Sequence, residues 1–404
     1  MTRDRIHFLF LNVGHFLDHL FMLIFATVAA LKLRHDWNMS YAELIPYATP
    51  GFIAFGLFSL PAGWLADKWS REGMMAVFFL GIGAASVGTA LASTPLEIAF
   101  WLFLVGAFGA IYHPVGIAMV IRDGAQNGMR LAVNGVWGNL GVGSAALVTG
   151  FLIDHVGWRS AFALPGLVSV ALGLAYVAFL RSEPAHERTA RKAAPGGGGA
   201  AVENLGNRSL FYVSAVIFFT TMVGSLIFQS TTFALPKIFE ERLGSLGTSA
   251  TTVGTYAFLV FALASMAQLV VGYLVDRHAV RTVFAGLAVL QIVFFLLMPG
   301  LIGVPALIVA LAFMLAVFGQ IPLNDFLIGR LSKSEFRARA LAARFVVAFT
   351  AIGLAVPILS WIHANWGFDR LFHVMAIGAA LILAAVVTLP RFAPRTHVQP
   401  APAE

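Results

Sequence analysis

Twelve long apolar segments dominate this chain and restrict it to a membrane-spanning fold. Of its 404 residues, 59% are hydrophobic and only 11% are charged, and the mean hydropathy is +0.85. A helix of about 20 apolar residues crosses the hydrocarbon layer, and a helix satisfies its own backbone hydrogen bonds there. We therefore predict an all-α membrane protein with twelve transmembrane helices, over residues 6–31, 43–66, 73–92, 96–121, 131–153, 158–181, 209–235, 250–274, 281–299, 304–329, 339–362 and 368–390. The first segment is too long, and lacks the small-residue cleavage site, for a removable signal peptide.

Lysine and arginine are distributed unevenly between the two sides of these predicted helices. If both termini lie inside, the inner segments carry 19 of them and the outer segments six. Loops rich in these residues stay on the cytoplasmic side. The asymmetry predicts a multi-pass protein of the bacterial inner (plasma) membrane with both termini cytoplasmic. It also accounts for the net charge of +7, so the expected partner of the basic surface is the anionic lipid bilayer rather than nucleic acid.

The chain repeats itself at a distance of about 210 residues. The charged loop motif GWLADKWSR at 63–71 returns as GYLVDRHAVR at 272–281, and Gly157-Trp158 returns as Gly367-Phe368. Membrane transporters are often built from two such parallel repeats, with the substrate site between them. We predict an N-terminal six-helix bundle at 1–181, a cytoplasmic linker at 182–208, a C-terminal six-helix bundle at 209–390 and a cytoplasmic tail at 391–404.

Ionisable residues within the predicted helices of the first half are candidate functional residues. His15 and His19 are four residues apart on one helix face, with Asp18 beside them, and His113 precedes Pro114, which should bend its helix. Charged groups at this depth are costly unless they face water or each other. The group of His15, Asp18, His19, Tyr112 and His113 is expected to carry a proton at the cavity. A structural hydrogen-bond network and a metal site at the two helix-one histidines are the alternatives.

Other polar side chains are expected to line a substrate cavity. Asn134 and Asn139 flank Trp137 in a glycine-rich helix, where Gly135, Gly138 and Gly141 should permit a close neighbour. In the second half, Gln229 is a candidate substrate contact, and the segment 237–242 is interpreted as an amphipathic surface turn. Arg344 lies about two turns into its helix, so it should face the cavity or Asp325; either a structural ion pair or an anion-binding arginine would explain it.

The duplicated loop motif resembles the signature of the major facilitator superfamily. The resemblance implies the fold of that superfamily and a cytoplasmic gate that holds the two bundles together. It assigns this gate to Asp67, Arg71, Asp276 and Arg281, with the start of the eleventh helix, near Ser334 and Arg337, as a counterpart.

The first five helices also resemble the fosmidomycin-resistance group of drug/proton antiporters within that superfamily. The histidines of the first helix, the sequence Tyr112-His113-Pro114 and the Gly-Asn-x-Gly of residues 138–141 carry this resemblance over about the first 155 residues. The chain departs from the group at Val115, where the group usually has an acid, and at Ala145-Ala146, where it usually has Gly-Pro.

These features together predict a transporter rather than an enzyme. No phosphate-binding G-x-x-x-x-G-K-[ST] sequence is present, so a proton gradient rather than ATP is the expected energy source. We predict a proton-coupled efflux antiporter of a small molecule that acts as a monomer without a cofactor. Uptake of a small organic anion by proton symport, divalent-metal export through the His15/His19 face, and a sensor that retains the fold are the alternatives. The sequence contains no cysteine, which excludes disulfide and thiol chemistry.

Overall fold

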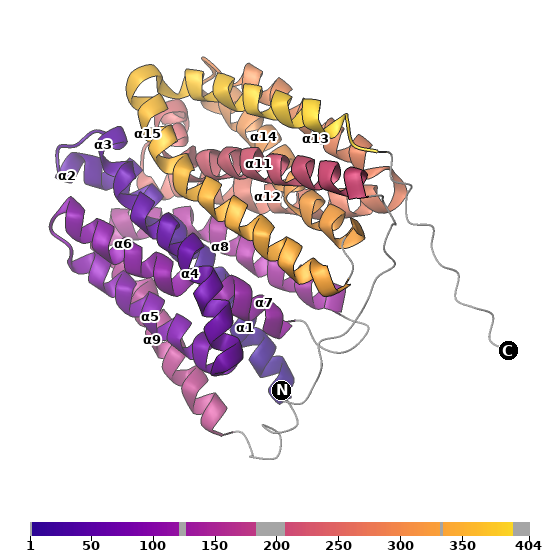
Figure 1. Ribbon diagram of the computed structural model, residues 1–404. Coiled ribbons are helices and arrows are strands. Elements are labelled where there is room, and N and C mark those ends of the chain that lie inside the picture. Colours follow the sequence, from indigo (N-terminus) through magenta and orange to yellow (C-terminus); the bar gives the residue numbers. More distant parts are fainter. Residues whose placement is uncertain (1, 121–126, 183–206, 332–333, 391–404) are drawn as a thin grey trace.

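The computed structural model describes residues 2–120, 127–182, 207–331 and 334–390, and these residues are almost entirely helical (Figure 1). Most of the predicted linker and all of the predicted tail lie outside the described residues. Among the described residues, eleven helices are long and apolar enough to cross a membrane. The last of them, Ala343–Val386, is interrupted at Gly367, whose backbone is not helical. Two spans therefore meet there, and the twelve-helix prediction is confirmed.

The first half of the chain forms six membrane spans. Three of them are composite, because short π-helical or 3₁₀ turns interrupt them. The spans are α1 (Arg3–Val28) with the π turn Ala29–Leu33 and α2 (Arg34–Asp36); α3 (Tyr41–Leu44) with the 3₁₀ turn Ile45–Ala48 and α4 (Thr49–Lys68); α5 (Arg71–Leu91); α6 (Pro95–Gly109) with the π turn Tyr112–Gly116 and α7 (Ile117–Val120); α8 (Asn127–His155); and α9 (Trp158–Arg181).

The second half forms the other six spans with fewer interruptions. They are α11 (Asn207–Arg242), followed by the 3₁₀ turn Gly244–Leu246; α12 (Ala250–Arg277); α13 (Val280–Leu297); α14 (Gly303–Leu331); and α15 (Ser334–Val386), which contains two spans separated at Gly367. In Figure 1 the indigo-to-magenta helices of the first half lie beside the orange and yellow helices of the second.

Hydroxyl side chains begin several of these helices. Ser70 Oγ accepts a hydrogen bond from the Gly73 amide at 3.0 Å, and Ser249 Oγ accepts one from the Thr252 amide at 3.1 Å. The first amides of a helix have no partner within it, so a serine at this position satisfies one of them. Ser70 lies in the first copy of the loop motif, and in both copies one helix ends and the next begins within the motif, at Lys68 and Arg71 and at Arg277 and Val280.

The repeated glycines of the sequence have a shared backbone role. Gly157 has φ +110° and Gly367 has φ +71°, and each lies immediately before the sixth span of its half. Side chains disfavour positive φ, whereas glycine adopts it readily. The repeat of Gly157-Trp158 at Gly367-Phe368 therefore encodes the same sharp reversal in both halves.

The two halves meet along two helix pairs, α8 with α12 and α4 with the first span of α15. Small residues make these contacts close. A Cβ on Gly254 of α12 would lie 2.3 Å from the Ala146 carbonyl oxygen of α8, and one on Gly56 of α4 would lie 2.9 Å from Phe349 Cβ. Glycine at such crossings lets two helices approach within backbone contact. Large apolar side chains such as Leu57, Phe211 and Leu167 are exposed on the outside, where a membrane protein meets lipid.

Candidate functional site

A cavity of about 380 Å³ lies between the two halves. Helices α1, α4 and α8 and the π turn Tyr112–Gly116 line it from the first half, and all five helices of the second half contribute to the other wall. The predicted site residues that line it are His15, His19, His113, Asn139, Gln229, Asp325 and Arg344. Its size falls in the range that small-molecule sites occupy.

Three histidines form a cluster on the first-half wall. The ring centroid of His15 lies 5.0 Å from that of His19 and 5.5 Å from that of His113. His15 Nδ1 is 2.8 Å from the Asn134 carbonyl oxygen, and a carbonyl can only accept, so Nδ1 carries a proton; in the neutral ring Nε2 then keeps a free lone pair. One nitrogen from each ring lies within 4.8 Å of the others, a spacing at which the three could share a cation.

Asp18 lies directly behind His113. The Asp18 carboxylate is fully buried, and its Oδ2 is 3.4 Å from His113 Nε2. Neither carboxylate oxygen has a hydrogen-bond partner among the described residues. His113 is held in a π turn because Pro114 has no backbone N–H to continue the helix. The bend that Pro114 introduces thus places an imidazole between a buried carboxylate and the cavity.

Besides Asp18, the predicted cavity residues Tyr112, Asn134 and Trp137 lie outside the cavity lining. Tyr112 is fully buried, and its hydroxyl donates to the Leu11 carbonyl at 2.8 Å and accepts from Asn134 Nδ2 at 2.9 Å. Asn134 Nδ2 also contacts Asn12 Oδ1 at 2.9 Å. Tyr112 stacks on His15 with ring centroids 4.8 Å apart, so this network supports the histidine cluster from behind. Trp137 is partly buried and does not line the cavity.

Two of the three glycines in the stripe of α8, Gly138 and Gly141, fit closely against α1. A Cβ on Gly138 would lie 2.6 Å from His15 Nε2, and one on Gly141 would lie 2.2 Å from the Phe16 carbonyl oxygen. Gly135 is different, because a Cβ there would meet nothing within 4 Å. Gly138 and Gly141 therefore let α8 approach α1 closely beside His15, whereas Gly135 faces the cavity.

An ion pair stands on the second-half wall. Arg344 Nη1 of α15 lies 2.8 Å from Asp325 Oδ1 of α14. The Arg344 side chain is 11% exposed and the Asp325 side chain 44% exposed, so the guanidinium is the deeper group. Buried Arg344 Nε has no hydrogen-bond partner among the described residues. The pair that the sequence suggested is present, yet it leaves guanidinium donors unused.

Amide and hydroxyl side chains fill the rest of that wall. Gln291 Nε2 donates to Gln320 Oε1 at 2.6 Å, and Thr220 Oγ1 donates to Asn324 Oδ1 at 2.9 Å. Gln229 and Gln291 are buried, and each has one amide atom without a partner within the described structure. Gln229 was identified from the sequence. Thr220, Gln291, Gln320 and Asn324 were missed, because a single polar side chain in an apolar helix gives no periodic signal.

Aromatic rings connect the two polar walls. Phe349 of α15 meets Phe55 of α4 at a centroid distance of 5.0 Å and Phe345 at 5.8 Å. The ring centroid of His113 is 6.0 Å from that of Phe349, and the Arg344 guanidinium carbon is 5.5 Å from the Phe345 ring centroid. The rings therefore form a continuous surface from the Asp18–His113 pair to the Asp325–Arg344 pair. The sequence did not indicate them, since phenylalanine is common throughout the chain.

The residues of the charged loop motif make contacts within their own halves. Arg71 Nη2 pairs with Asp67 Oδ1 at 2.9 Å, and Arg281 Nη1 donates to the Leu389 carbonyl at 3.1 Å. Asp67, Arg71 and Asp276 are exposed. The side chains of Ser334 and Arg337 lie outside those that the structure describes, so the predicted counterpart is not visible. We call this end of the molecule the motif end.

The opposite end, by contrast, is joined across the halves. Arg34 of α2 contacts Glu240 of α11 at 2.7 Å, Ser360 Oγ of α15 donates to the Ala42 carbonyl at 2.6 Å, and the Asp154 carboxylate at the end of α8 accepts from the amides of Ala250 and Thr251 at the start of α12. Among the described residues, the polar links between the halves gather here rather than at the motif end.

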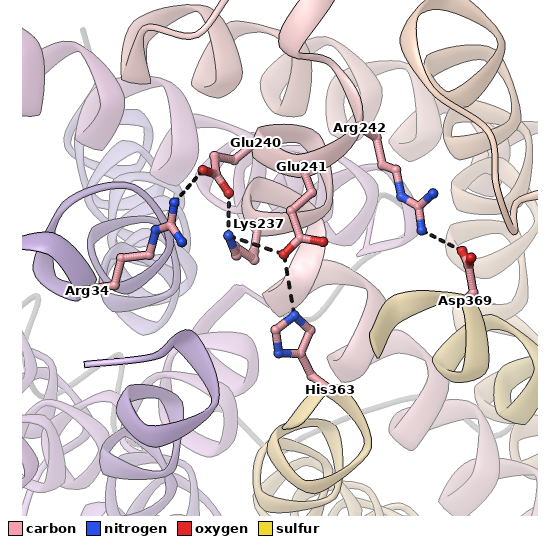
Figure 2. A network of polar contacts seen from close by, with 7 residues as sticks. All are labelled: Arg34, Lys237, Glu240, Glu241, Arg242, His363 and Asp369. Carbon is pink, nitrogen blue, oxygen red and sulfur yellow. Dashed lines mark hydrogen bonds and ion pairs between the residues drawn. The ribbon is translucent and has the colours of Figure 1, made fainter. Parts of the chain in front are cut away.

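The network at this opposite end is shown in Figure 2. Lys237 is 3% exposed and contacts both Glu240 and Glu241, and His363 Nε2 lies 3.5 Å from Glu241 Oε1. The interpretation of 237–242 as a surface turn is therefore wrong. The segment ends helix α11, and its charges are spaced three and four residues apart, which places them on one helix face. That spacing was the signal that the sequence offered.

A cavity at the interface of two six-helix halves, with ionisable groups on both walls, defines a membrane transport protein. The chain belongs to the Major Facilitator Superfamily, whose family model matches residues 11–245 and 217–404. It is a multi-pass transporter and not an enzyme.

Relatives with assigned functions differ in how much of the chain they match. The chain is 25% identical over 409 aligned residues to a gallate transporter of Pseudomonas putida, and the match covers 89% of each protein. It is 26% identical to the tetracenomycin C resistance and export protein of Streptomyces glaucescens, but there the match covers 39% of this chain and 30% of the relative. It is also 29% identical to a niacin transporter of Acinetobacter baylyi over 39% of this chain and 36% of the relative.

Solved structures agree on the fold. The chain superposes on a D-xylose-proton symporter with a TM-score of 0.71 and 15% identity, covering 96% of this chain and 99% of the other. It superposes on a peptide transporter in complex with alafosfalin with a TM-score of 0.72 and 12% identity, again covering 96% and 99%. At these identities the likeness concerns the arrangement of the helices.

Proposed function

We propose that this protein is a proton-coupled secondary transporter that moves a small organic molecule across the bacterial inner membrane. The observation that carries the proposal is the cavity between the halves, with the Asp18–His113 pair on one wall and the Asp325–Arg344 pair on the other. In a secondary transporter, such a site is exposed first to one side of the membrane and then to the other.

In this proposal the coupled proton resides on the Asp18–His113 pair, with His15 and His19 as its neighbours. Histidine is the side chain whose charge ordinarily changes near neutral pH. Asp18 is sealed from the cavity, and His113 lines it. A proton from the cavity therefore reaches Asp18 through His113. Tyr112 and Asn134 hold His15 in place, and Asn139, Gln229 and the Asp325–Arg344 pair contact the substrate.

The two halves, residues 1–181 and 209–390, are proposed to move as bodies about the cavity. The polar links at the opposite end close that side, and the charged loop motif residues Asp67, Arg71, Asp276 and Arg281 form the gate at the motif end. We place the motif end and both termini in the cytoplasm because of the lysine and arginine asymmetry. The conformation described would then be closed toward the outside.

Export by antiport is the direction that the first-half resemblance to drug/proton antiporters implies. Matches to an export protein cover only part of the chain. Uptake of an organic anion by proton symport is the second candidate, and two observations favour it. Arg344 supplies a deep cation in the cavity, and the relative matched over 89% of both proteins is named a gallate transporter.

Purified protein in proteoliposomes with an imposed pH gradient tests both directions. Substrates from panels of drugs and organic anions are added outside, and internal pH is followed with a trapped dye. Substrate-dependent proton influx supports symport, and substrate-dependent proton efflux supports antiport. Substrate movement that leaves internal pH unchanged and ignores the gradient contradicts proton coupling.

A further inference from the structure

We propose that the substrate is a flat aromatic carboxylate with a hydrogen-bonding substituent on its ring, and that its carboxylate takes the place of Asp325 on Arg344. This inference rests on the proposed function, to which it adds the substrate class. Three separate features of the cavity carry it: an incompletely paired guanidinium, an aromatic surface, and buried amides with unused atoms.

The Arg344 guanidinium has N–H donors that could bind a second acceptor. A guanidinium has five N–H donors in a planar fork, and the only ion pair described for Arg344 uses Nη1, while buried Nε stays without a hydrogen-bond partner. A carboxylate that meets the fork with both oxygens forms two parallel charge-assisted hydrogen bonds. A carboxylate ligand thus satisfies donors that Asp325 leaves unused, whereas a cationic ligand would add repulsion.

Asp325 can be displaced because it is the more exposed partner. Its side chain is 44% exposed as a whole, against 11% for Arg344, although the paired Oδ1 is itself buried and makes no hydrogen bond within the described structure. Water in the cavity can therefore solvate Asp325 once it leaves. Arg344 has no such alternative, since a buried unpaired charge is strongly unfavourable. An incoming carboxylate therefore replaces one acceptor by another at the buried cation, and the released carboxylate becomes hydrated.

The neighbouring surface favours a ring. Phe345 lies beneath the Arg344 guanidinium, and Phe349 and Phe55 extend the surface toward His113. Aromatic pairs prefer edge-to-face or offset arrangements and gain about 0.5–1.5 kcal/mol beyond simple burial. A ring bound next to the carboxylate would meet the cavity-facing edges of these phenylalanines, while an aliphatic chain would forgo that gain.

The amides suit a polar substituent on that ring. Gln229 and Gln291 are buried at 4% and 1% exposure, line the cavity, and each keeps an amide atom without a partner in the described structure. Leaving such a group unsatisfied costs free energy that a ligand hydroxyl would recover. A hydroxyl both donates and accepts, so it can serve either amide atom.

Binding to the full-length protein in detergent, measured by isothermal titration calorimetry, tests this inference. The probes are 4-hydroxybenzoate, its neutral analogue 4-hydroxybenzamide, its alicyclic analogue 4-hydroxycyclohexanecarboxylate, and benzoate. We expect 4-hydroxybenzoate to bind most tightly and the neutral analogue to bind at least about tenfold more weakly, the factor that loss of a charged hydrogen bond implies. The alicyclic and unsubstituted analogues should each be several-fold weaker.

Two variants of the ion pair should shift 4-hydroxybenzoate binding in opposite directions. Arg344→Gln should weaken it by about tenfold or more, whereas Asp325→Asn should strengthen it, because Arg344 loses its competing partner. Arg159→Gln, which alters an arginine bonded to the Ala92 carbonyl away from the cavity, should leave it unchanged. Thermal melting of each variant confirms that it is folded.

The inference is overturned if both pair variants weaken binding, if 4-hydroxybenzamide binds as well as 4-hydroxybenzoate, or if none of the four probes binds. Failure of the proposed function would look different. Wild-type protein would then bind 4-hydroxybenzoate in the expected order, yet proteoliposomes would show no movement of the probe and no change of internal pH.

Discussion

His113 Nε2 lies 3.4 Å from Asp18 Oδ2, and this contact joins the π turn Tyr112–Gly116 to helix α1. Asp18 is fully buried, whereas His113 lines the cavity. The carboxylate therefore has an imidazole between itself and the cavity. An ionisable group so deep in a membrane protein is costly unless it has a role, and the contact with His113 is what connects Asp18 to the cavity.

Asp18→Asn should reduce proton-driven transport to near background, because the amide keeps the shape of the side chain but cannot take up a proton. Exchange of labelled for unlabelled substrate without a pH gradient should persist, since the substrate contacts are intact. Both rates are measured in proteoliposomes. Asp36→Asn is the matched control, because Asp36 pairs with Lys32 at 3.0 Å at the opposite end; equal losses in the two variants would refute the role of Asp18.

Arg34→Gln should open the opposite end of the molecule. The Arg34–Glu240 contact joins the halves and is partly buried. Its loss should destabilise the closed conformation relative to the open one by about 1 kcal/mol, which is roughly a fivefold shift in their populations. The chain has no cysteine, so Ala42→Cys, at a position 8% exposed, provides a single label site.

A membrane-impermeant maleimide added outside should then modify Ala42→Cys several-fold faster in the Arg34→Gln background than in the parent. Lys32→Gln serves as the control, because Lys32 pairs within its own half. An unchanged labelling rate in Arg34→Gln would show that the ion pair does not hold the halves together.

Asp154→Ala should lower the melting temperature of the purified protein. Asp154 accepts hydrogen bonds from the Ala250 amide at 3.2 Å and from the Thr251 amide at 2.7 Å, at the start of α12 in the other half. A carboxylate at a helix N-terminus satisfies free amides and the helix dipole, and losing such a cap costs about 1 kcal/mol. Asp154→Asn keeps one acceptor oxygen and should lose less; the reverse order would argue against capping.

Gly141→Ala and Gly135→Ala should differ sharply in stability although both replace a glycine in the same stripe of α8. A Cβ at Gly141 would lie 2.2 Å from the Phe16 carbonyl oxygen, and one at Gly135 would meet nothing. The first change should cost about 1–3 kcal/mol by overpacking, whereas the second should be neutral or slightly stabilising because alanine favours helix. Size-exclusion profiles after heating report the difference, and similar losses at both positions would contradict the packing.

Charged and histidine side chains within apolar helices could be identified from the sequence. Arg344 and Asp325 stood out as charges in apolar helices, and they form a pair on the cavity wall. His15, His19 and His113 stood out likewise, and they cluster on the facing wall. Tyr112 and Asn134 were also identified, but their side chains lie behind the cavity. There they form hydrogen bonds with each other and with residues of α1.

The chain's composition and its internal repeat determined the helical fold, the number of spans and the existence of two halves, because lipid leaves an apolar segment few alternatives. Tertiary structure alone decided which polar groups face the cavity, which aromatic rings connect its walls, and that the halves are joined at the end bearing Arg34 and Glu240. Hydropathy reports only that a segment is buried from water. The rotation of each helix and its crossing partner depend on contacts between residues far apart in sequence, such as Gly254 with Ala146.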